Sequence, residues 1–209
     1  MLKLGLTGGI ASGKSAVGEM FVKRGAHLIQ SDAVAHALME PGLAVYEKVV
    51  DRFGREILNP DGTINRSRLA EAAFGSPGSA PPRVKELNDI VHPAVIDQEN
   101  KWMEGIGRRD PNAIAMVEAA LILEAGVGGR FDRLIVVTCG PEQRILRFAR
   151  RLGISEDAAR VEVTRRMAAQ IPDEEKVKAA DFVIDNSGSL HATEEQVERI
   201  FAALRQTSL

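Results

Sequence analysis

The sequence has 209 residues, 44% of them hydrophobic, which is enough for one substantial core with a smaller subdomain attached. The net charge of −2 at pH 7 argues against a nucleic-acid partner, which would require an excess of clustered Lys and Arg. The sequence has a single cysteine and no apolar run of the roughly 20 residues that span a bilayer, and its first residues run into an apolar strand without the basic region or cleavage site expected of a signal peptide. We therefore expect a cytoplasmic protein that binds a small molecule, with no membrane partner.

The first predicted elements enclose a phosphate-binding motif. Residues 2–7 form a short apolar strand, and a helical apolar period follows until Gly25. Between them, "GGIASGKS" matches the P-loop pattern G-x-x-x-x-G-K-S, whose glycines let backbone amides converge on phosphate oxygens. Lys14 is expected to reach the β- and γ-phosphates, and Ser15 to bind Mg²⁺. The motif predicts ATP and Mg²⁺ as cofactors, with ATP bound by Gly8, Gly9, Ile10, Ala11, Ser12, Gly13, Lys14, Ser15 and Ala16.

A second strand, predicted at 26–30, leads directly to Asp32. With the usual strand order, this strand would neighbour the P-loop strand, and Asp32 would lie at the carboxyl edge where open parallel sheets bind ligands. A carboxylate there can accept the proton of an acceptor hydroxyl during phosphoryl transfer. An N-cap for the apolar helical run that follows is an equally good interpretation. From the residues alone, both interpretations remain open.

Three more buried strands are predicted at 113–118, 133–138 and 181–185, with helical segments between them. Strands that alternate with helices indicate a parallel sheet covered on both faces. The predicted fold is thus an α/β fold with a P-loop NTPase-type parallel sheet flanked by helices. Its core would comprise residues 1–40, 110–140 and 180–209.

Two regions depart from this alternation. Residues 41–109 are mostly helical, with a turn at "NPDGT" and a Gly/Pro/Ser-rich loop at 75–82, and they predict a helical acceptor-binding subdomain. Residues 141–179 predict a helical lid.

In the first lid helix Arg144, Arg147 and Arg151 recur on one face, opposite an apolar face, as expected of a cationic surface that closes over phosphates. An ordinary solvated face is the alternative, and Lys176 is interpreted as a surface charge.

Several segments together resemble the dephospho-CoA kinase family over nearly the whole chain: "LTGGIASGKSAV", "LIQSDAVA", "DGTINRSRL", "LNDIVHP", "ALILEAG", "RLIVVTCGPE" and "AADFVIDNSG". The resemblance implies a P-loop metabolite kinase that uses ATP to phosphorylate the ribose 3′-hydroxyl of dephospho-CoA. Its product would be coenzyme A, so that the reaction is the last step of coenzyme A biosynthesis.

The resemblance also implies roles for individual residues. Asp32 matches the second Asp of the family's D-A-D pair, which is taken as the catalytic base, whereas Gln30 replaces the first Asp. Arg147 matches the family's lid arginine, so that the implied catalytic residues are Asp32, Lys14 and Arg147. Ala11 stands where the family usually has glycine.

Three further roles carry open alternatives. Arg66 would meet a phosphate of the acceptor or be solvated, and Glu124 would contact the acceptor or cap the segment that follows it. Asn186 would touch the adenine, or the segment "DNSG" would simply form an Asx-turn. The implied substrate-binding residues are Asp32, Arg66 and Glu124.

Two alternative functions share the P-loop. One is another small-metabolite kinase of the nucleoside, nucleotide or shikimate type, and the other is a non-catalytic ATP-binding regulatory module. The sequence does not predict the oligomeric state.

Overall fold

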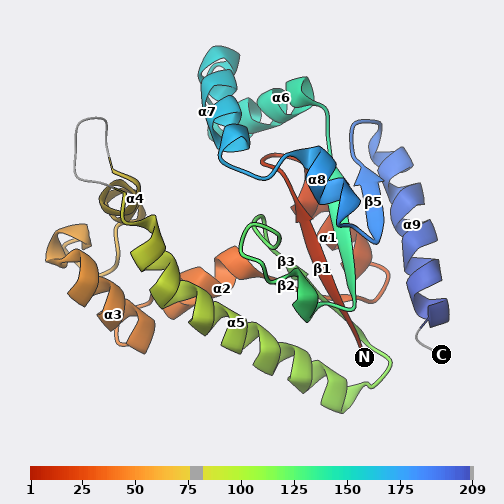
Figure 1. Ribbon diagram of the computed structural model, residues 1–209, viewed down its shortest axis with the longest axis horizontal. Coiled ribbons are helices and arrows are strands. Elements are labelled where there is room, and N and C mark those ends of the chain that lie inside the picture. Colours follow the sequence, from red (N-terminus) through yellow and green to blue (C-terminus); the bar gives the residue numbers. More distant parts are fainter. Residues whose placement is uncertain (76–81, 208–209) are drawn as a thin grey trace. The chain divides into compact units, whose positions relative to one another are not determined.

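A computed structural model describes residues 1–75 and 82–207, so most of the predicted loop at 75–82 lies outside the described residues. Its sheet has five parallel strands in the order β2-β3-β1-β4-β5 (Figure 1). The strands are β1 (Leu2–Gly8), β2 (His27–Gln30), β3 (Ile114–Glu118), β4 (Arg133–Thr138) and β5 (Phe182–Asp185). All five predicted strands and the α/β fold class are confirmed.

The strand order corrects one expectation. The neighbour of the P-loop strand β1 on one side is β3, and β2 lies beyond it at the edge of the sheet. The segment with Asp32 therefore does not follow a strand next to β1. Parallel strands are joined by a crossover connection. The connection from β1 through the following helix to β2 spans the position in the sheet that β3 occupies.

Helices connect the strands and form the rest of the chain. They are α1 (Lys14–Val22), α2 (Ser31–Leu38), α3 (Ala44–Phe53), α4 (Arg66–Phe74), α5 (Val84–Arg109), α6 (Pro141–Leu152), α7 (Glu156–Ala168), α8 (Asp173–Lys178) and α9 (Leu190–Thr207). Short 3₁₀ turns occur at Arg55–Ile57 and Gly128–Arg130. Among the described residues, no helix is both long enough and apolar enough to cross a membrane.

The chain divides into two compact units. One comprises Met1–Gln30 and Met103–Leu209, and the other is the helical unit Ser31–Trp102. The helical unit thus begins and ends earlier than the predicted subdomain at 41–109. It includes α2 because this helix contacts α3.

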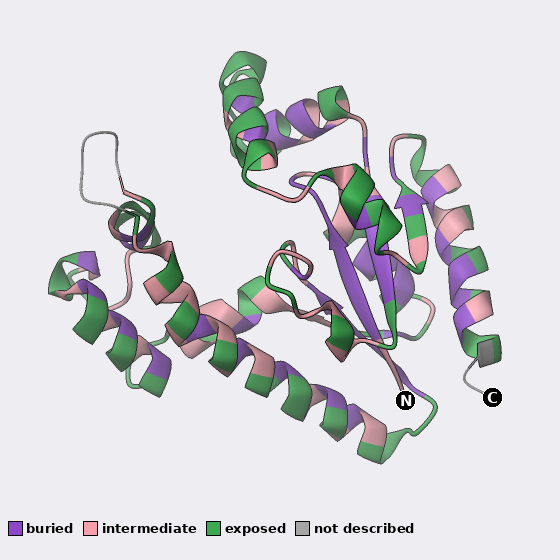
Figure 2. Cartoon of the chain, in the orientation of Figure 1, coloured by how far each residue is buried: buried purple, intermediate pink, exposed green. Residues whose placement is uncertain are grey.

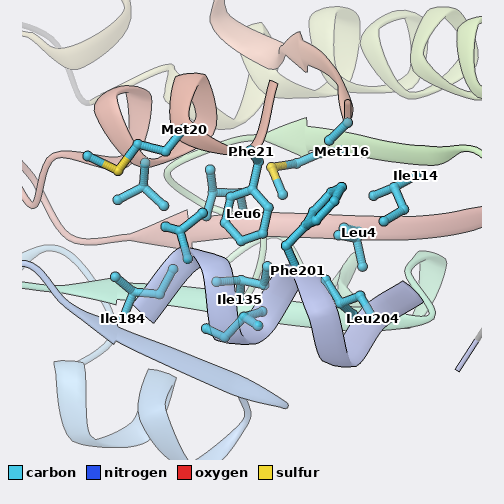
Figure 3. Packing of buried hydrophobic residues seen from close by; sticks show 14 of the residues in the cluster. Leu4, Leu6, Met20, Phe21, Ile114, Met116, Ile135, Ile184, Phe201 and Leu204 are labelled. Carbon is cyan, nitrogen blue, oxygen red and sulfur yellow. The ribbon is translucent and has the colours of Figure 1, made fainter. Parts of the chain in front are cut away.

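The main core of the first unit lies between the sheet and two helices. Leu6, Met116 and Ile135 point from the strands toward α1 and α9, and these side chains are fully buried (Figure 3). Phe21 of α1 and Phe201 of α9 meet with ring centroids 6.3 Å apart. Figure 2 shows the inner strands as buried and the outer sides of the helices as exposed. Removing such apolar surface from water stabilises the fold by about 25 cal/mol per Å².

The lid helices are anchored by a separate apolar cluster. Ile10, at the tip of the P-loop, is 8% exposed and packs with Ile145, Phe148 and Ala149 of α6 and with Val163 of α7. The apolar face predicted for the first lid helix is thus confirmed at these positions, although Leu152 at its end is exposed. The side chain of Ile10 serves this packing, while its backbone remains part of the loop.

In the helical unit, a tight turn precedes α4. Residues Leu58 and Ile64 form an isolated antiparallel bridge, and the Asp61 carboxylate accepts a hydrogen bond from the Thr63 amide at 2.9 Å. Asn65 then caps α4, because its side-chain oxygen accepts from the amides of the second and third residues of that helix. Arg66 is the first residue of α4, so the turn and the cap fix the position of its backbone.

Candidate active site

The phosphate loop has the backbone that its glycines predict. Gly13 adopts φ +91° directly before α1, in the left-handed region that glycine tolerates best. A Cβ atom at Gly8 would lie only 2.2 Å from the Val137 carbonyl oxygen on β4. Side chains at these two positions would distort the loop. The N-terminus of α1 thereby presents its amides at the carboxyl end of β1, as an anion site requires.

Lys14 extends back over this loop. Its ammonium donates to the carbonyl oxygens of Gly8 at 3.0 Å and Gly9 at 3.3 Å. The positive charge is therefore held at the cradle, where it can bind the β- and γ-phosphates of a nucleotide.

Ser15 meets an acidic residue that the sequence analysis missed. The Ser15 hydroxyl donates to Oε1 of Glu118 at 2.7 Å, and Glu118 is 8% exposed at the end of β3. The signal that could have found Glu118 is an acidic residue that ends a buried strand beside the P-loop strand. In P-loop enzymes, an acid at this place and the loop Ser/Thr hold Mg²⁺.

The donor set suits magnesium. Hydroxyl and carboxylate oxygens are the ligands that Mg²⁺ prefers, and the ion usually takes one or two protein ligands, with waters and substrate phosphates completing its shell. Within residues 1–75 and 82–207, no cluster of three or more His, Cys, Asp or Glu residues could hold a metal by itself. Ser15 and Glu118 are therefore the residues that fit a nucleotide-bound Mg²⁺.

Arg147 reaches the P-loop from α6. One terminal nitrogen donates to the Ser12 carbonyl oxygen at 3.2 Å, and the other donates to the Asn186 carbonyl oxygen at 2.9 Å. The predicted lid arginine thus lies on the loop that would hold the phosphates. Burial raises the pKa of the neighbouring Cys139 thiol, and the nearby Arg147 and Arg144 guanidiniums only partly oppose this rise. Cys139 is accordingly a protonated, buried thiol rather than a nucleophile.

Asn186 supports the P-loop from the end of β5. Its amide nitrogen donates to the Ser12 carbonyl oxygen at 2.8 Å, and its side-chain oxygen accepts from the Thr193 hydroxyl at 2.9 Å. The Asx-turn predicted at "DNSG" is confirmed, because the Asp185 carboxylate accepts a hydrogen bond from the Ser187 amide at 2.9 Å. An adenine contact by Asn186 stays a prediction.

Two charged residues of the lid region are buried, contrary to expectation. Arg144 is 1% exposed, forms an ion pair with Asp173 and donates to the Cys139 carbonyl oxygen, so it is not part of a solvated cationic face. A Cβ atom at Gly9 would lie 2.0 Å from its Nη1, which shows how closely the guanidinium covers the loop. A partner carboxylate and a carbonyl oxygen compensate the burial of this charge.

Lys176 is also buried, at 0% exposure, and its interpretation as a surface charge is wrong. Its ammonium lies 2.7 Å from Oε1 of Glu124, as an ion pair without the angles of a hydrogen bond. The same carboxylate oxygen accepts from the Ile171 amide at 3.2 Å, so Glu124 fixes the segment before α8. Whether Glu124 also contacts an acceptor stays a prediction.

The helical unit carries a pocket of its own. The pocket is lined by His36, Met39, Glu40, Thr63, Ile64 and Arg66. Burial, followed by the charge of Arg66, lowers the pKa of His36 below its usual 6.5, and the charge of Asp32 opposes this. The imidazole is thus mainly neutral at pH 7, and Arg66 supplies the positive charge of the pocket.

Asp32 lies in the first turn of α2. Because α2 begins at Ser31, Asp32 does not precede the helix as an N-cap would. The Ser31 hydroxyl donates to a Glu99 oxygen at 2.5 Å, and Asp32 itself is exposed. Whether Asp32 meets an acceptor hydroxyl stays a prediction.

Comparisons with known proteins identify the family of the chain. The family model described as dephospho-CoA kinase matches residues 2–192. A dephospho-CoA kinase of Corynebacterium efficiens is 37% identical over 204 residues, covering 98% of each chain. A Thermus thermophilus crystal structure superposes with a TM-score of 0.76 at 32% identity and covers 97% of both chains. The fold is also that of a Campylobacter jejuni dephospho-CoA kinase, with a TM-score of 0.69, 24% identity, and 99% of this chain and 98% of that one covered. The chain belongs to the dephospho-CoA kinase family.

Proposed function

We propose that this protein transfers the γ-phosphoryl group of ATP to the ribose 3′-hydroxyl of dephospho-CoA and so produces coenzyme A. The single observation that carries the proposal is the intact phosphate cradle, in which Lys14 lies on the loop and Ser15 pairs with Glu118. Membership of the family supports the identity of the acceptor.

The positive groups of the cradle have a common role. Phosphoryl transfer needs little covalent chemistry from the protein, because positioning and charge stabilisation supply most of the rate. Lys14 and Arg147 would stabilise the negative charge of the transferred group, and the α1 amides would hold the β-phosphate. When bound at Ser15 and Glu118, Mg²⁺ would neutralise charge on the phosphate oxygens.

The acceptor would meet the helical unit. We assign Asp32 to accept the proton of the 3′-hydroxyl, because it is exposed and has no role as a helix N-cap. We assign Arg66 to a phosphate of dephospho-CoA, because it provides the positive charge of the pocket that it lines. We place the protein in the cytoplasm, where a buried free thiol such as Cys139 is ordinary.

An acceptor panel tests the proposal. The purified protein is incubated with Mg-ATP and, separately, with dephospho-CoA, adenosine, AMP or shikimate, and the products are identified by mass spectrometry and NMR. We expect one product, dephospho-CoA phosphorylated at the ribose 3′-oxygen. Transfer to shikimate or a nucleoside alone would replace the acceptor assignment, and ATP binding without any transfer would indicate a regulatory module.

Asp32→Asn tests the assigned base. We expect this variant to lose turnover by roughly 100-fold or more, the range that general-base catalysis contributes, while its affinity for ATP stays near that of the wild type. Asp51→Asn is the matched control, because Asp51 is an exposed acid on α3 in the same unit. Near-normal turnover of Asp32→Asn would remove Asp32 as the base.

A further inference from the structure

Gln30 and Glu118 occupy the same level of the sheet. They are register partners on the adjacent parallel strands β2 and β3, and each is the last residue of its strand. Side chains at one level of neighbouring parallel strands project to the same face, so these two meet at the carboxyl edge. Nε2 of Gln30 donates to Oε2 of Glu118 at 3.0 Å.

The carboxylate of Glu118 thus has one donor on each oxygen. Ser15 donates to Oε1 at 2.7 Å, and Gln30 donates to Oε2. A carboxylate that is 8% exposed needs such partners, because burying an unpaired charge is costly. The two hydrogen bonds also fix the rotation of the carboxylate, which keeps Oε1 directed at the Ser15 hydroxyl.

The amide is well suited to this position. A carboxylate in place of Gln30 would remove the amide that donates to Glu118. Such a group is acceptor-only when ionised, and it would set a second negative charge beside Glu118. Gln30 is a neutral donor, so Glu118 is held by a hydrogen bond and meets no like charge from position 30.

We propose that Gln30 is a positioning residue that acts through Glu118. Its amide holds the carboxylate in the orientation in which Glu118 and Ser15 together form the protein's share of the Mg²⁺ site. The proposal rests on the proposed function for the assignment of Mg-ATP to the P-loop.

Gln30→Leu tests this role, because leucine has a similar volume and no donor. Mutation of a residue that hydrogen-bonds to a metal ligand typically weakens metal binding by 10- to 100-fold. We therefore expect Gln30→Leu to bind Mn²⁺, used as a probe for Mg²⁺, about 10-fold more weakly than the wild type does. The measurement is an EPR titration of Mn²⁺ into protein saturated with a non-hydrolysable ATP analogue. Affinity for the analogue in EDTA should stay within about 2-fold, because the donors of the cradle are intact.

Two further variants separate positioning from general damage. Gln196→Leu is the matched control, since it removes an amide that donates to the Asp185 carbonyl oxygen at 2.9 Å, outside the network. It should leave Mn²⁺ affinity unchanged. The double variant Gln30→Leu/Glu118→Gln should bind Mn²⁺ no more weakly than Glu118→Gln alone, because Gln30 acts through that carboxylate.

Three results would overturn the proposal. They are an unchanged Mn²⁺ affinity in Gln30→Leu, additive losses in the double variant, and an equal loss of analogue binding in EDTA. The titration contains no acceptor, so its outcome is independent of which acceptor the panel identifies.

Discussion

The buried ion pair between Lys176 and Glu124 makes a quantitative prediction about stability. Lys176 is 0% exposed, the Glu124 side chain is 16% exposed, and their charged atoms lie 2.7 Å apart. Lys176→Met leaves the Glu124 carboxylate buried without its counter-charge. Removing one partner of a buried pair costs about 3–5 kcal/mol, whereas replacing both by uncharged groups is often nearly neutral.

The structure favours the lower end of this range. Glu124 keeps some exposure and still accepts from the Ile171 amide, so we expect Lys176→Met to lower the free energy of unfolding by about 3 kcal/mol. For a chain of this size, each kcal/mol lowers the melting temperature by roughly 2–4 °C, which gives a fall of roughly 6–12 °C. Lys176→Met/Glu124→Gln should recover more than half of the loss, because glutamine still accepts from Ile171.

Thermal unfolding followed by circular dichroism measures these shifts. The control is Lys178→Met, which removes an exposed lysine of the same helix from its pair with Glu175 and should cost at most about 1 kcal/mol. If Lys176→Met behaves like this control, or if the double variant loses the sum of the two single losses, the reasoning is refuted. An acceptor KM that rises in the folded double variant would instead support a contact between Glu124 and dephospho-CoA.

Three further predictions concern the lid, the phosphate loop and the helical unit. Arg147→Ala should lower kcat by roughly 100-fold or more, with a fall in melting temperature of only a few degrees, and an unchanged kcat would make Arg147 purely structural. Ala11 adopts φ +53°, so Ala11→Gly should relieve about 1 kcal/mol of strain and raise the melting temperature by roughly 2–4 °C, whereas a fall would contradict this. His36 has a lowered pKa in the folded state, so the folded protein binds fewer protons there than the unfolded chain, and His36 costs stability as the pH falls below 6.5. As the pH falls from about 8 to about 5, the free energy of unfolding of His36→Gln should therefore rise relative to that of the wild type in denaturant titrations. A difference in unfolding free energy that does not change with pH would refute the lowered pKa of His36.

The features that the sequence predicted are those that local signals determine. Each of the five strands is a short apolar run bounded by turn residues, and the P-loop is a fixed spacing whose glycines meet a backbone requirement at Gly8 and Gly13. Such signals need no knowledge of which element lies beside which. They were therefore sufficient for the fold class and for the phosphate cradle.

The errors concern charged residues whose partners are distant in the sequence. The helical period predicted a cationic face with Arg144 that closes over phosphates, or alternatively a solvated face, and gave no sign that this residue is buried in an ion pair. In the structure that face of α6 lies against the P-loop, and Asp173 supplies the counter-charge. Lys176 was misjudged for the same reason, since its partner Glu124 precedes β4 in the chain whereas Lys176 follows it.

Glu118 was missed because its role depends on the strand order. If β2 were the neighbour of β1, the acid next to the P-loop would come from the segment after β2. Asp32 would then be the candidate both for binding Mg²⁺ and for accepting the proton of the acceptor hydroxyl. The order β2-β3-β1 instead places Glu118 between Gln30 and the strand that leads into the P-loop. The two proposed tasks therefore fall on different residues, Glu118 for the metal and Asp32 for the acceptor hydroxyl. With this order, the neutral Gln30 at the end of β2 donates to the same carboxylate that accepts from Ser15.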